Sequence, residues 1–477
     1  MTAAWDDASQ TSVEPTKKAF HESPESRRHK GRSLRKNCPR SAHRECGVSD
    51  IGRDSMGLME ASNRDRLEHL LPVRFTRMAE SSFSFFRGTS VLQAADLRRC
   101  PSSGVIVQCC GDCHLLNFGE FATPERSLVF DINDFDETFP APFEWDVKRL
   151  AVSFVLATRW LKFSKADANA AVQLMVSTYR SQMAKYAKMS VLDTWYAKVT
   201  VHQLMKESQE DEKTRSILKK NLRKAEQSTA KHVFEKLTTM IDGRLRIAAQ
   251  PPLIFHSDDY EHLMQNAIQP FLEGYRNSLM QDRKVLFDRY RIVDAAYKVV
   301  GVGSVGTRCF IILLLDTQDK PLFLQIKEAR ASVLDPERDG SAVLHNGQRI
   351  VEGQRLIQCA SDIFLGWSRG LEGREFYVRQ LRDMKVAPDL TNYTPKLLSG
   401  YGRLCGRVLA RAHAKAGDAV LISGYMGSSE KFDTAIIDYA FAYAEQVEKD
   451  YERFREAIRD GRFPIETIAG ETEQAIR

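Results

Sequence analysis

Two short stretches, 110–118 and 128–136, hold the residues whose types and spacing best suit chemistry. Asp112 is followed five positions later by Asn117, and further carboxylates come after a short turn. Phosphoryl transfer needs such a set, because one carboxylate orients the nucleophile while an amide oxygen and another carboxylate hold Mg²⁺. Mg²⁺ prefers hard oxygen ligands and usually keeps water and substrate phosphates in its shell, so two protein ligands suffice. The spacing therefore predicts a magnesium-dependent phosphoryl-transfer site.

The first stretch has the pattern G-D-x-H-x-x-N, and the second contains D-F-D. The first resembles the catalytic loop of aminoglycoside-phosphotransferase-like kinases, and the second resembles the kinase D-F-G metal motif. The resemblance implies that Asp112 is the catalytic base, that Asn117 is a metal ligand and that Asp134 is the main metal carboxylate, with Asp131 as the alternative. Cys110 departs from the pattern, because those kinases usually have His there.

A hairpin should join the two stretches, with strands at 118–121 and 128–133 and a turn at 123–126. This register favours Asp134 over Asp131 as the metal ligand. Asp136 and Glu137 are expected to cap backbone groups and face solvent, as acids near turns commonly do. Asp146, at the start of a predicted helix over 143–162, is expected to hydrogen-bond the catalytic loop.

A second constellation lies almost two hundred residues further on. A strand at 291–300 precedes a G-x-G-x-x-G loop, which is followed by strands at 309–315 and 321–326 and then by Lys327. Glycines let backbone amides approach phosphates, and a lysine on the third strand pairs with them in kinases. The predicted nucleotide contacts are Gly301, Gly303, Ser304, Gly306, Lys327 and Glu352, the last as the helix carboxylate that pairs with the lysine.

Other interpretations of the glycine loop remain. A dinucleotide-binding fold would need a helix after the glycines, and 309–315 is too apolar and β-rich for one. A plain hairpin with flexible glycines and a surface lysine is also compatible with the pattern. Glu352 is as readily a solvated surface acid. An adenine-binding hinge would fall near 385–388.

Composition sets further bounds. The 477 residues are 43% hydrophobic and 28% charged, with a net charge of +6, as in ordinary globular proteins of more than one domain. Such a small charge argues against a dedicated nucleic-acid binder, and no stable nucleic-acid binding is expected. No apolar run reaches the roughly 18 residues of a membrane span. The polar start lacks the pattern of a secretory signal, and nine scattered cysteines favour reduced thiols in the cytoplasm.

Four regions follow from these patterns. Residues 1–60, rich in Ser, Arg, Lys and His, are predicted to be a disordered basic tail. Residues 61–289 should form the catalytic-loop segment and a helical lobe, and residues 290–390 a small antiparallel nucleotide lobe. Residues 391–477 should be helices that pack on the helical lobe. The predicted fold class is α+β, with two kinase-like lobes.

The order of parts is reversed relative to ordinary kinases, in which the glycine loop and lysine precede the catalytic loop. Reading from residue 290 to the end and then from 100 to 290 restores the kinase order. The sequence therefore predicts a circularly permuted kinase-like fold, a rearrangement that proteins tolerate where the termini lie close together on the surface.

A more specific resemblance covers about residues 65–460. The motifs that carry it include R-F-T-R-M, F-F-R-G, G-D-C-H-L-L-N-F-G, F-D-I-N-D-F-D-E-T, E-W-D-V-K-R-L, V-G-V-G-S-V-G-T-R, F-L-Q-I-K-E-A and V-E-G-Q-R-L. In this order they resemble the bacterial family catalogued as domain of unknown function two-two-five-two. That family brings no established substrate.

Three functions compete at this stage. The first is an ATP- and Mg²⁺-dependent phosphotransferase that acts on an unknown hydroxyl-bearing acceptor. The second is a kinase-like nucleotide-binding or regulatory module without turnover, which the Cys110 departure leaves open. The third is a metal-dependent phosphohydrolase, which would use the acids without the lobe around Lys327.

Overall fold

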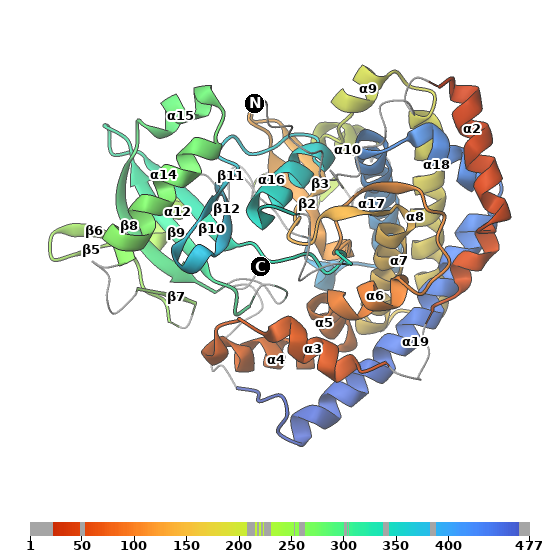
Figure 1. Cartoon of the computed structure of the whole chain (residues 1–477), viewed down its shortest axis with the longest axis horizontal. Coiled ribbons are helices and arrows are strands. Elements are labelled where there is room, and N and C mark those ends of the chain that lie inside the picture. Colours follow the sequence, from red (N-terminus) through yellow and green to blue (C-terminus); the bar gives the residue numbers. More distant parts are fainter. Residues whose placement is uncertain are drawn as a thin grey trace, which may run out of the picture.

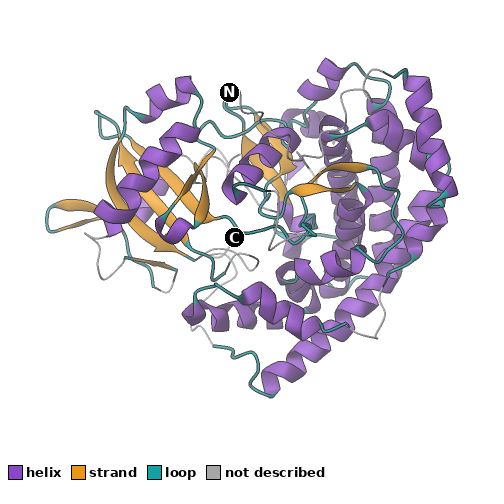
Figure 2. Cartoon of the chain, viewed as in Figure 1, coloured by secondary structure: helices purple, strands orange, loops and turns teal. Residues whose placement is uncertain are grey.

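A computed structural model describes residues 22–47, 53–207, 215–216, 219–220, 223, 230–251, 253–256, 263–299, 303, 305–336, 343–381 and 388–466. The chain is a mixed α+β protein, as the sequence predicts. Figure 1 shows a sheet on the left and a larger helical body on the right, and Figure 2 shows that most strands gather on one side.

The sheet has six antiparallel strands in the order β11-β12-β10-β9-β8-β7. Helix α14 (Gln269–Ser278) packs on β11, and α12 (Ala230–Leu237) packs on β10. Apolar side chains fill both faces of β9, which is buried along its whole length and so tolerates a continuous apolar run. The strands are β7 (Ile254–Phe255), β8 (Arg291–Lys298), β9 (Cys309–Leu315), β10 (Pro321–Glu328), β11 (Gly366–Arg369) and β12 (Glu375–Gln380).

The predicted lobe boundary at residue 290 is wrong. Strand β7 joins the sheet, and the hairpin of β5 (Thr238–Ile241) and β6 (Arg244–Ile247) leads into it. Helix α14 contributes Phe271 and Tyr275 to the core of the sheet. The segment from residue 230 therefore belongs to the sheet unit, because its apolar residues need the sheet to cover them.

The helical body is built around α7 (Glu144–Trp160), which is buried on nearly every side. Helix α7 packs against α5, α8 and α19, and α8 packs closely on α17. A Cβ atom at Gly406 would lie 2.2 Å from the carbonyl oxygen of Met175, so glycine is required where these two helices meet. The bounds are α5 (Ser82–Gly88), α8 (Lys165–Tyr186), α17 (Pro395–Ala416), α18 (Ala419–Met426) and α19 (Lys431–Arg459).

Two small two-stranded sheets lie between the sheet unit and the helical body. Strand β1 (Ile106–Cys109) pairs with β4 (Phe139–Pro142), and β2 (Phe118–Ala122) pairs with β3 (Leu128–Ile132). The predicted hairpin is thereby confirmed. Together the two sheets bring residues 110–117 beside residues 133–138.

The prediction of disorder in the N-terminal tail is wrong for residues 22–47. Helix α2 (Pro24–Ser33) packs on α18, and His43 is buried against the hydroxyl of Tyr425 at 2.7 Å. Arg35 and Arg40 donate to the carbonyls of Tyr425 and Met426, at the end of α18. Basic groups stabilise the carboxyl end of a helix, so this basic segment docks on a protein surface. Residues 1–21 and 48–52 lie outside the described part of the chain.

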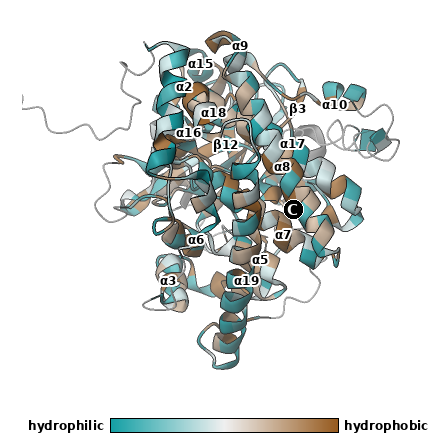
Figure 3. Cartoon of the chain, turned by 90° about the vertical axis from the view of Figure 1, so that its right-hand side faces the viewer, coloured by the Kyte–Doolittle hydropathy of each residue, from teal (hydrophilic) through white to brown (hydrophobic). Residues whose placement is uncertain are grey.

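The remaining elements connect these bodies. In Figure 3 many helices carry both hydrophobic and hydrophilic residues along their length, as helices with one buried face do. Within the described residues, no helix combines the length and the apolar composition that a bilayer crossing demands. The remaining bounds are η1 (Leu34–Lys36), η2 (Arg40–Arg44), α3 (Ser55–Asn63), η3 (Glu68–Leu70), α4 (Leu71–Ala79), α6 (Ser90–Leu97), η4 (Leu115–Asn117), α9 (Val191–Tyr196), α10 (Val201–Glu207), η5 (Leu263–Ile268), α15 (Gln281–Phe287), α16 (Asn346–Ile357), η7 (Leu371–Gly373) and η8 (Leu390–Asn392).

Candidate active site

The loop that carries Asp112 is fixed from below by α7. Asp146, in the first turn of that helix, accepts hydrogen bonds from the backbone N–H groups of Cys110 at 2.8 Å and Gly111 at 3.0 Å. This confirms its predicted role. Gly111 has a φ of +87°, and a Cβ atom there would lie 2.1 Å from the carbonyl oxygen of Glu137. Only glycine allows the loop to turn so close to residues 128–137, which we call the acidic segment.

Asp112 is held by a cation of the helical body. The Nε atom of Arg149 donates to Oδ1 of Asp112 at 2.6 Å, while Nε2 of His114 lies 3.8 Å from Oδ2. Burial raises the pKa of Asp112, and the charge of Arg149 opposes this shift. Burial also lowers the pKa of His114 well below its usual value, with Arg87 and Arg149 adding to the effect. His114 is therefore neutral beside the carboxylate.

Asn117 braces the loop from within. Its side-chain nitrogen donates to the backbone carbonyl of Asp112 at 2.6 Å, and its backbone carbonyl accepts from the backbone N–H of Asn133 at 2.8 Å. A metal would be bound by the amide oxygen, so bracing and metal binding are compatible roles. Asp134 follows at the end of the hairpin, and its Oδ1 accepts from the backbone of Asp136 at 3.3 Å.

The alternative assignment of Asp131 as the metal ligand is wrong. Its side chain is 1% exposed and pairs with the equally buried Arg411, at 2.8 and 3.0 Å. The backbone N–H groups of Ile132 and Cys359 also donate to it. The two oxygens of Asp131 are thereby occupied within the protein interior, because a buried carboxylate must be paired.

Lys327 contacts the acidic segment, although the two are far apart in the chain. Its ammonium lies 2.6 Å from Oδ2 of Asp136, and the hydroxyl of Tyr377 on β12 donates to Oδ1 at 2.6 Å. Burial would raise the pKa of Asp136, but the charge and hydrogen bond of Lys327 and the hydrogen bond from Tyr377 lower it to about 2. Asp136 is therefore ionised, and the expectation that it merely faces solvent is wrong.

Glu352 does not pair with Lys327, so that prediction is also wrong. It lies on the exposed face of α16 and accepts from the side-chain amide of Gln348 at 2.7 Å. The same helix instead sends Arg349 inward, where it donates to the carbonyls of Thr138, Asp136 and Arg330. Helix α16 thus holds the acidic segment through an arginine, because the register of the helix turns Arg349 and not Glu352 towards it.

The described part of the glycine loop docks on the N-terminal helices. Gly306 has a φ of +85°, and its carbonyl accepts from the backbone of Leu67 at 2.7 Å. The carbonyl of Gly303 accepts from Arg66 at 3.1 Å and Arg74 at 3.0 Å. The predicted contacts Gly301 and Ser304, and most of the predicted hinge at 385–388, lie outside the described residues.

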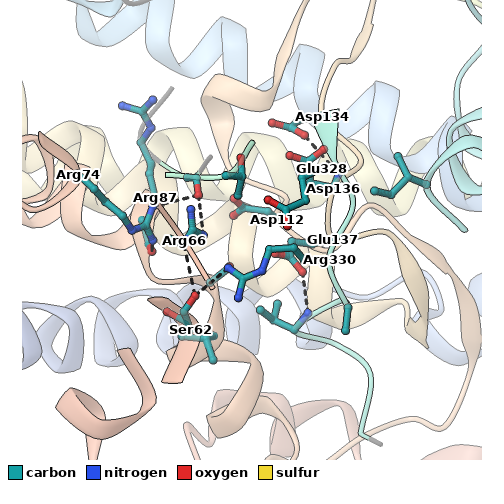
Figure 4. Close-up of a pocket in the computed structure, with 18 residues that line it drawn as sticks. Ser62, Arg66, Arg74, Arg87, Asp112, Asp134, Asp136, Glu137, Glu328 and Arg330 are labelled. Carbon is teal, nitrogen blue, oxygen red and sulfur yellow. Dashed lines mark hydrogen bonds between the residues drawn. The ribbon is translucent and has the colours of Figure 1, made fainter. Parts of the chain in front are cut away.

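One cavity joins several of these groups. Its open volume, mouth included, is about 790 Å³, and its lining includes Asp112, Asp134, Asp136 and Gly303. Figure 4 shows Asp112 between Asp134 and Asp136 on one side and Arg66, Arg74 and Arg87 on the other. The predicted catalytic loop, metal motif and glycine loop thus share one cavity, with Lys327 bound to its wall through Asp136.

The cysteines of the loop gather on its inner side. Cys110, Cys113 and Asp146 place their ligand atoms within 4.8 Å of one another, and so do Cys109, Asp146 and His413. Nε2 of His413 lies 3.2 Å from Asp146, and its Nδ1 lies 2.8 Å from the hydroxyl of Tyr179. These buried groups brace the catalytic loop from below, while His114 lies on the side of Asp112.

Sequence reasoning missed several residues of this site. Asp136 is two positions after Asp134 in D-F-D, and that spacing is the only signal for it. Arg149 follows Asp146 at helical spacing, which places both on the face of α7 that meets the loop. Arg66, Arg74 and Arg330 carry no local signal, because they reach the cavity from three separate elements.

The fold and site define a two-unit α+β protein with one charged cavity between its sheet unit and its helical body. A family model described as "Uncharacterized protein conserved in bacteria (DUF2252)" matches residues 66–457, and the chain belongs to that family. Searches of curated proteins and of solved structures gave no significant match. The docked α2 segment precedes the matched region.

Proposed function

We propose that this chain is a circularly permuted, kinase-like phosphotransferase that moves the γ-phosphoryl group of ATP, with Mg²⁺, to a hydroxyl-bearing acceptor. The observation that carries the proposal is the pair between Lys327 and Asp136, which are 191 positions apart. A lysine on the third strand of an antiparallel sheet and the acids after a G-D-x-H-x-x-N loop are the parts that phosphoryl transfer brings together.

The cavity supports this proposal by its donor set. Asp134 lines the cavity and offers a carboxylate, and Asn117, on the loop that carries Asp112, offers an amide oxygen. These are ligands that Mg²⁺ prefers, so the residues present fit this ion. Bound with the nucleotide, Mg²⁺ would neutralise charge on the phosphates. Lys327 would bind phosphate oxygens, and the amides of the loop around Gly303 would approach them as in other anion-binding backbone turns.

Asp112 supplies the proposed base. The acceptor oxygen forms a bond to the γ-phosphorus, the bond from that phosphorus to the β–γ bridging oxygen breaks, and ADP leaves with the electron pair. The hydroxyl proton passes to the Asp112 carboxylate. Because Arg149 occupies Oδ1, Oδ2 is the atom that receives the proton. Asp112 also orients the hydroxyl, and such a positioned base contributes about 10²–10⁴-fold in rate.

A nucleotide-binding module without turnover is the second candidate. The Asp112–Arg149 pair favours it, because a carboxylate neutralised by a buried cation is a weaker base. The two candidates share nucleotide binding and differ in phosphoryl transfer, so one experiment can separate them.

The test measures Mg-ATP binding by calorimetry on the full chain and then phosphoryl transfer to a panel of hydroxyl compounds by phosphorus NMR. We expect saturable binding, and transfer that falls about 10²–10⁴-fold in Asp112→Asn while binding persists. Asp288→Asn, an exposed acid paired with Arg276, is the matched control. Absence of Mg-ATP binding would refute both candidates. Binding without any transfer would refute the phosphotransferase and support the nucleotide-binding module.

A further inference from the structure

Arginines form one wall of the cavity. Four of them line it, and they come from three parts of the chain: the segment before α4, helices α4 and α5, and the loop after β10. In Figure 4 the arginines Arg66, Arg74 and Arg87 lie on the side of Asp112 away from Asp134 and Asp136. We call this group the arginine wall, and its members are Arg66, Arg74, Arg87 and Arg330.

Backbone carbonyls hold much of this wall in place. Within the described residues, the hydrogen bonds of Arg66 go to the carbonyls of Ser62, Gly303 and Val305. Arg74 donates to the carbonyls of Gly303 and Gly88, and Arg330 donates to those of Ser62 and Arg64. A carbonyl satisfies a donor without neutralising its charge, so these contacts orient the guanidinium groups and leave their charge in place.

The charges of the arginine wall lie close enough together to affect one another. Burial lowers the pKa of Arg66 well below its usual value, and the charges of Arg74 and Arg330 lower it further, while the carboxylates of Glu137 and Glu328 oppose the shift. Burial and the charge of Arg330 lower the pKa of Arg74 to about 10. Cations that are desolvated together are stabilised by an anion that enters between them.

The position of the arginine wall indicates whether the anion that it binds belongs to the nucleotide or to the acceptor. Arg66 and Arg74 donate to carbonyl oxygens of the glycine loop, whereas under the proposed function the nucleotide phosphates bind loop amides and the lysine. Arg87 also lies near enough to Asp112 for its charge to lower the pKa of that carboxyl against the effect of burial. The acceptor must meet Asp112 within hydrogen-bonding reach, so the arginine wall lies on the acceptor side of the base.

From this geometry we infer that the acceptor carries a phosphate group in addition to the hydroxyl that Asp112 orients, and that the arginine wall binds this phosphate. The inference rests on the proposed function and names its substrate class. Guanidinium groups bind phosphate through paired, charge-assisted hydrogen bonds.

The first experiment titrates inorganic phosphate, by calorimetry, into the full chain saturated with Mg²⁺ and a non-hydrolysable ATP analogue. We expect phosphate to bind beside the analogue, and Arg87→Ala to weaken it by at least about tenfold, the loss of one charge-assisted contact. Arg87→Lys should lose less, because it keeps the charge. Arg291→Ala is the control, since that arginine is 62% exposed and pairs with Asp319 on the surface.

Several outcomes would overturn the inference. Phosphate that competes with the analogue would assign the arginine wall to the nucleotide. Nucleotide binding without phosphate binding, or phosphate binding that ignores Arg87, would refute the acceptor site and leave the proposed function standing. If Arg87→Ala does not fold, as judged by thermal unfolding, Arg330→Lys takes its place.

The second experiment compares turnover of hydroxyl compounds with that of their phosphomonoesters. We expect the phosphomonoesters to be preferred, and Arg87→Ala to raise their KM by about tenfold or more with a smaller change in kcat. A preference for the uncharged compounds would refute the inference. A protein that binds phosphate at Arg87 but no nucleotide would refute both the proposed function and the acceptor assignment.

Discussion

Two ion pairs tie the acidic segment 128–137 to distant parts of the chain, and they differ in burial. Asp131 pairs with Arg411, 280 positions away, with both side chains 1% exposed. Asp136 pairs with Lys327, 191 positions away, but its side chain is 28% exposed and lines the cavity. An acid sealed in the interior and one that faces the cavity are therefore only five positions apart in the chain.

The difference teaches how to distinguish a structural acid from a functional one. Asp131 and its ion-pair partner Arg411 are both sealed from solvent, so the role of Asp131 is to fasten β3 to α17. Asp136 also holds two partners, Lys327 and Tyr377, but its own side chain lines the cavity. Under the proposed function the pair on the cavity wall holds Lys327 for an anionic ligand, whereas breaking the buried pair of Asp131 and Arg411 should cost stability.

The strongest way to break this comparison is Arg411→Ala. It leaves the carboxylate of Asp131 buried without its cation, so the free energy of unfolding should fall by about 3–5 kcal/mol. Urea unfolding measures the change. Arg407→Ala on the same helix removes a surface pair with Glu207 and should cost no more than about 1 kcal/mol. Equal losses in the two variants would contradict the structural role of Asp131.

Lys327→Ala should act on binding more than on stability. Loss of a charge-assisted phosphate contact is worth about 1.5–3 kcal/mol, which corresponds to roughly 10–100-fold in the dissociation constant of Mg-ATP. Calorimetry on the folded variant measures it, and Lys320→Ala, on the turn before β10, is the control. Unchanged affinity in Lys327→Ala would remove the main support for the proposed function.

The free energy of unfolding should depend on pH through Lys415, which lies near the buried pair of Asp131 and Arg411. Its ammonium donates to the carbonyl of Gln358 at 2.7 Å. Burial and the charge of Arg411 lower its pKa from 10.5 to about 8. Between these values the unfolded chain binds the proton more readily, so stability rises with pH there. Relative to Lys415→Gln, the wild type should gain about 2 kcal/mol from pH 8 to 10.5 in urea unfolding. A flat difference would contradict the shift.

The smallest effect is expected for Glu352→Ala. Its side chain is exposed and bonds only a neighbour on its own helix, so unfolding free energy should change by less than about 0.5 kcal/mol. Nucleotide affinity should stay the same. Arg349→Ala, three positions earlier, removes contacts to the acidic segment and should weaken both properties. A loss of affinity in Glu352→Ala would restore the pairing that the sequence suggested.

Local patterns predicted much of this fold. The hairpin of β2 and β3, the helix α7 and the three strands around the glycine loop all follow from periodicity and turn chemistry within short windows. The mixed α+β class follows from the same patterns. The errors lie in two segments that have no clear hydrophobic periodicity. The segment from residue 230 to β7 contains strands too short to be recognised from an alternating pattern. The basic tail lacks an apolar stripe that would indicate that it packs on another helix.

The sequence by itself determined that Asp112, Asn117 and Asp134 share one loop-and-hairpin unit and that a lysine lies near the end of the second strand after a glycine loop, because these relations span few residues. Only the tertiary structure decided that Asp131 is sealed by Arg411, that Asp136 and not Glu352 meets Lys327, and that four arginines form one wall. Those contacts join segments far apart in the chain, and the packing of sheet and helices sets them.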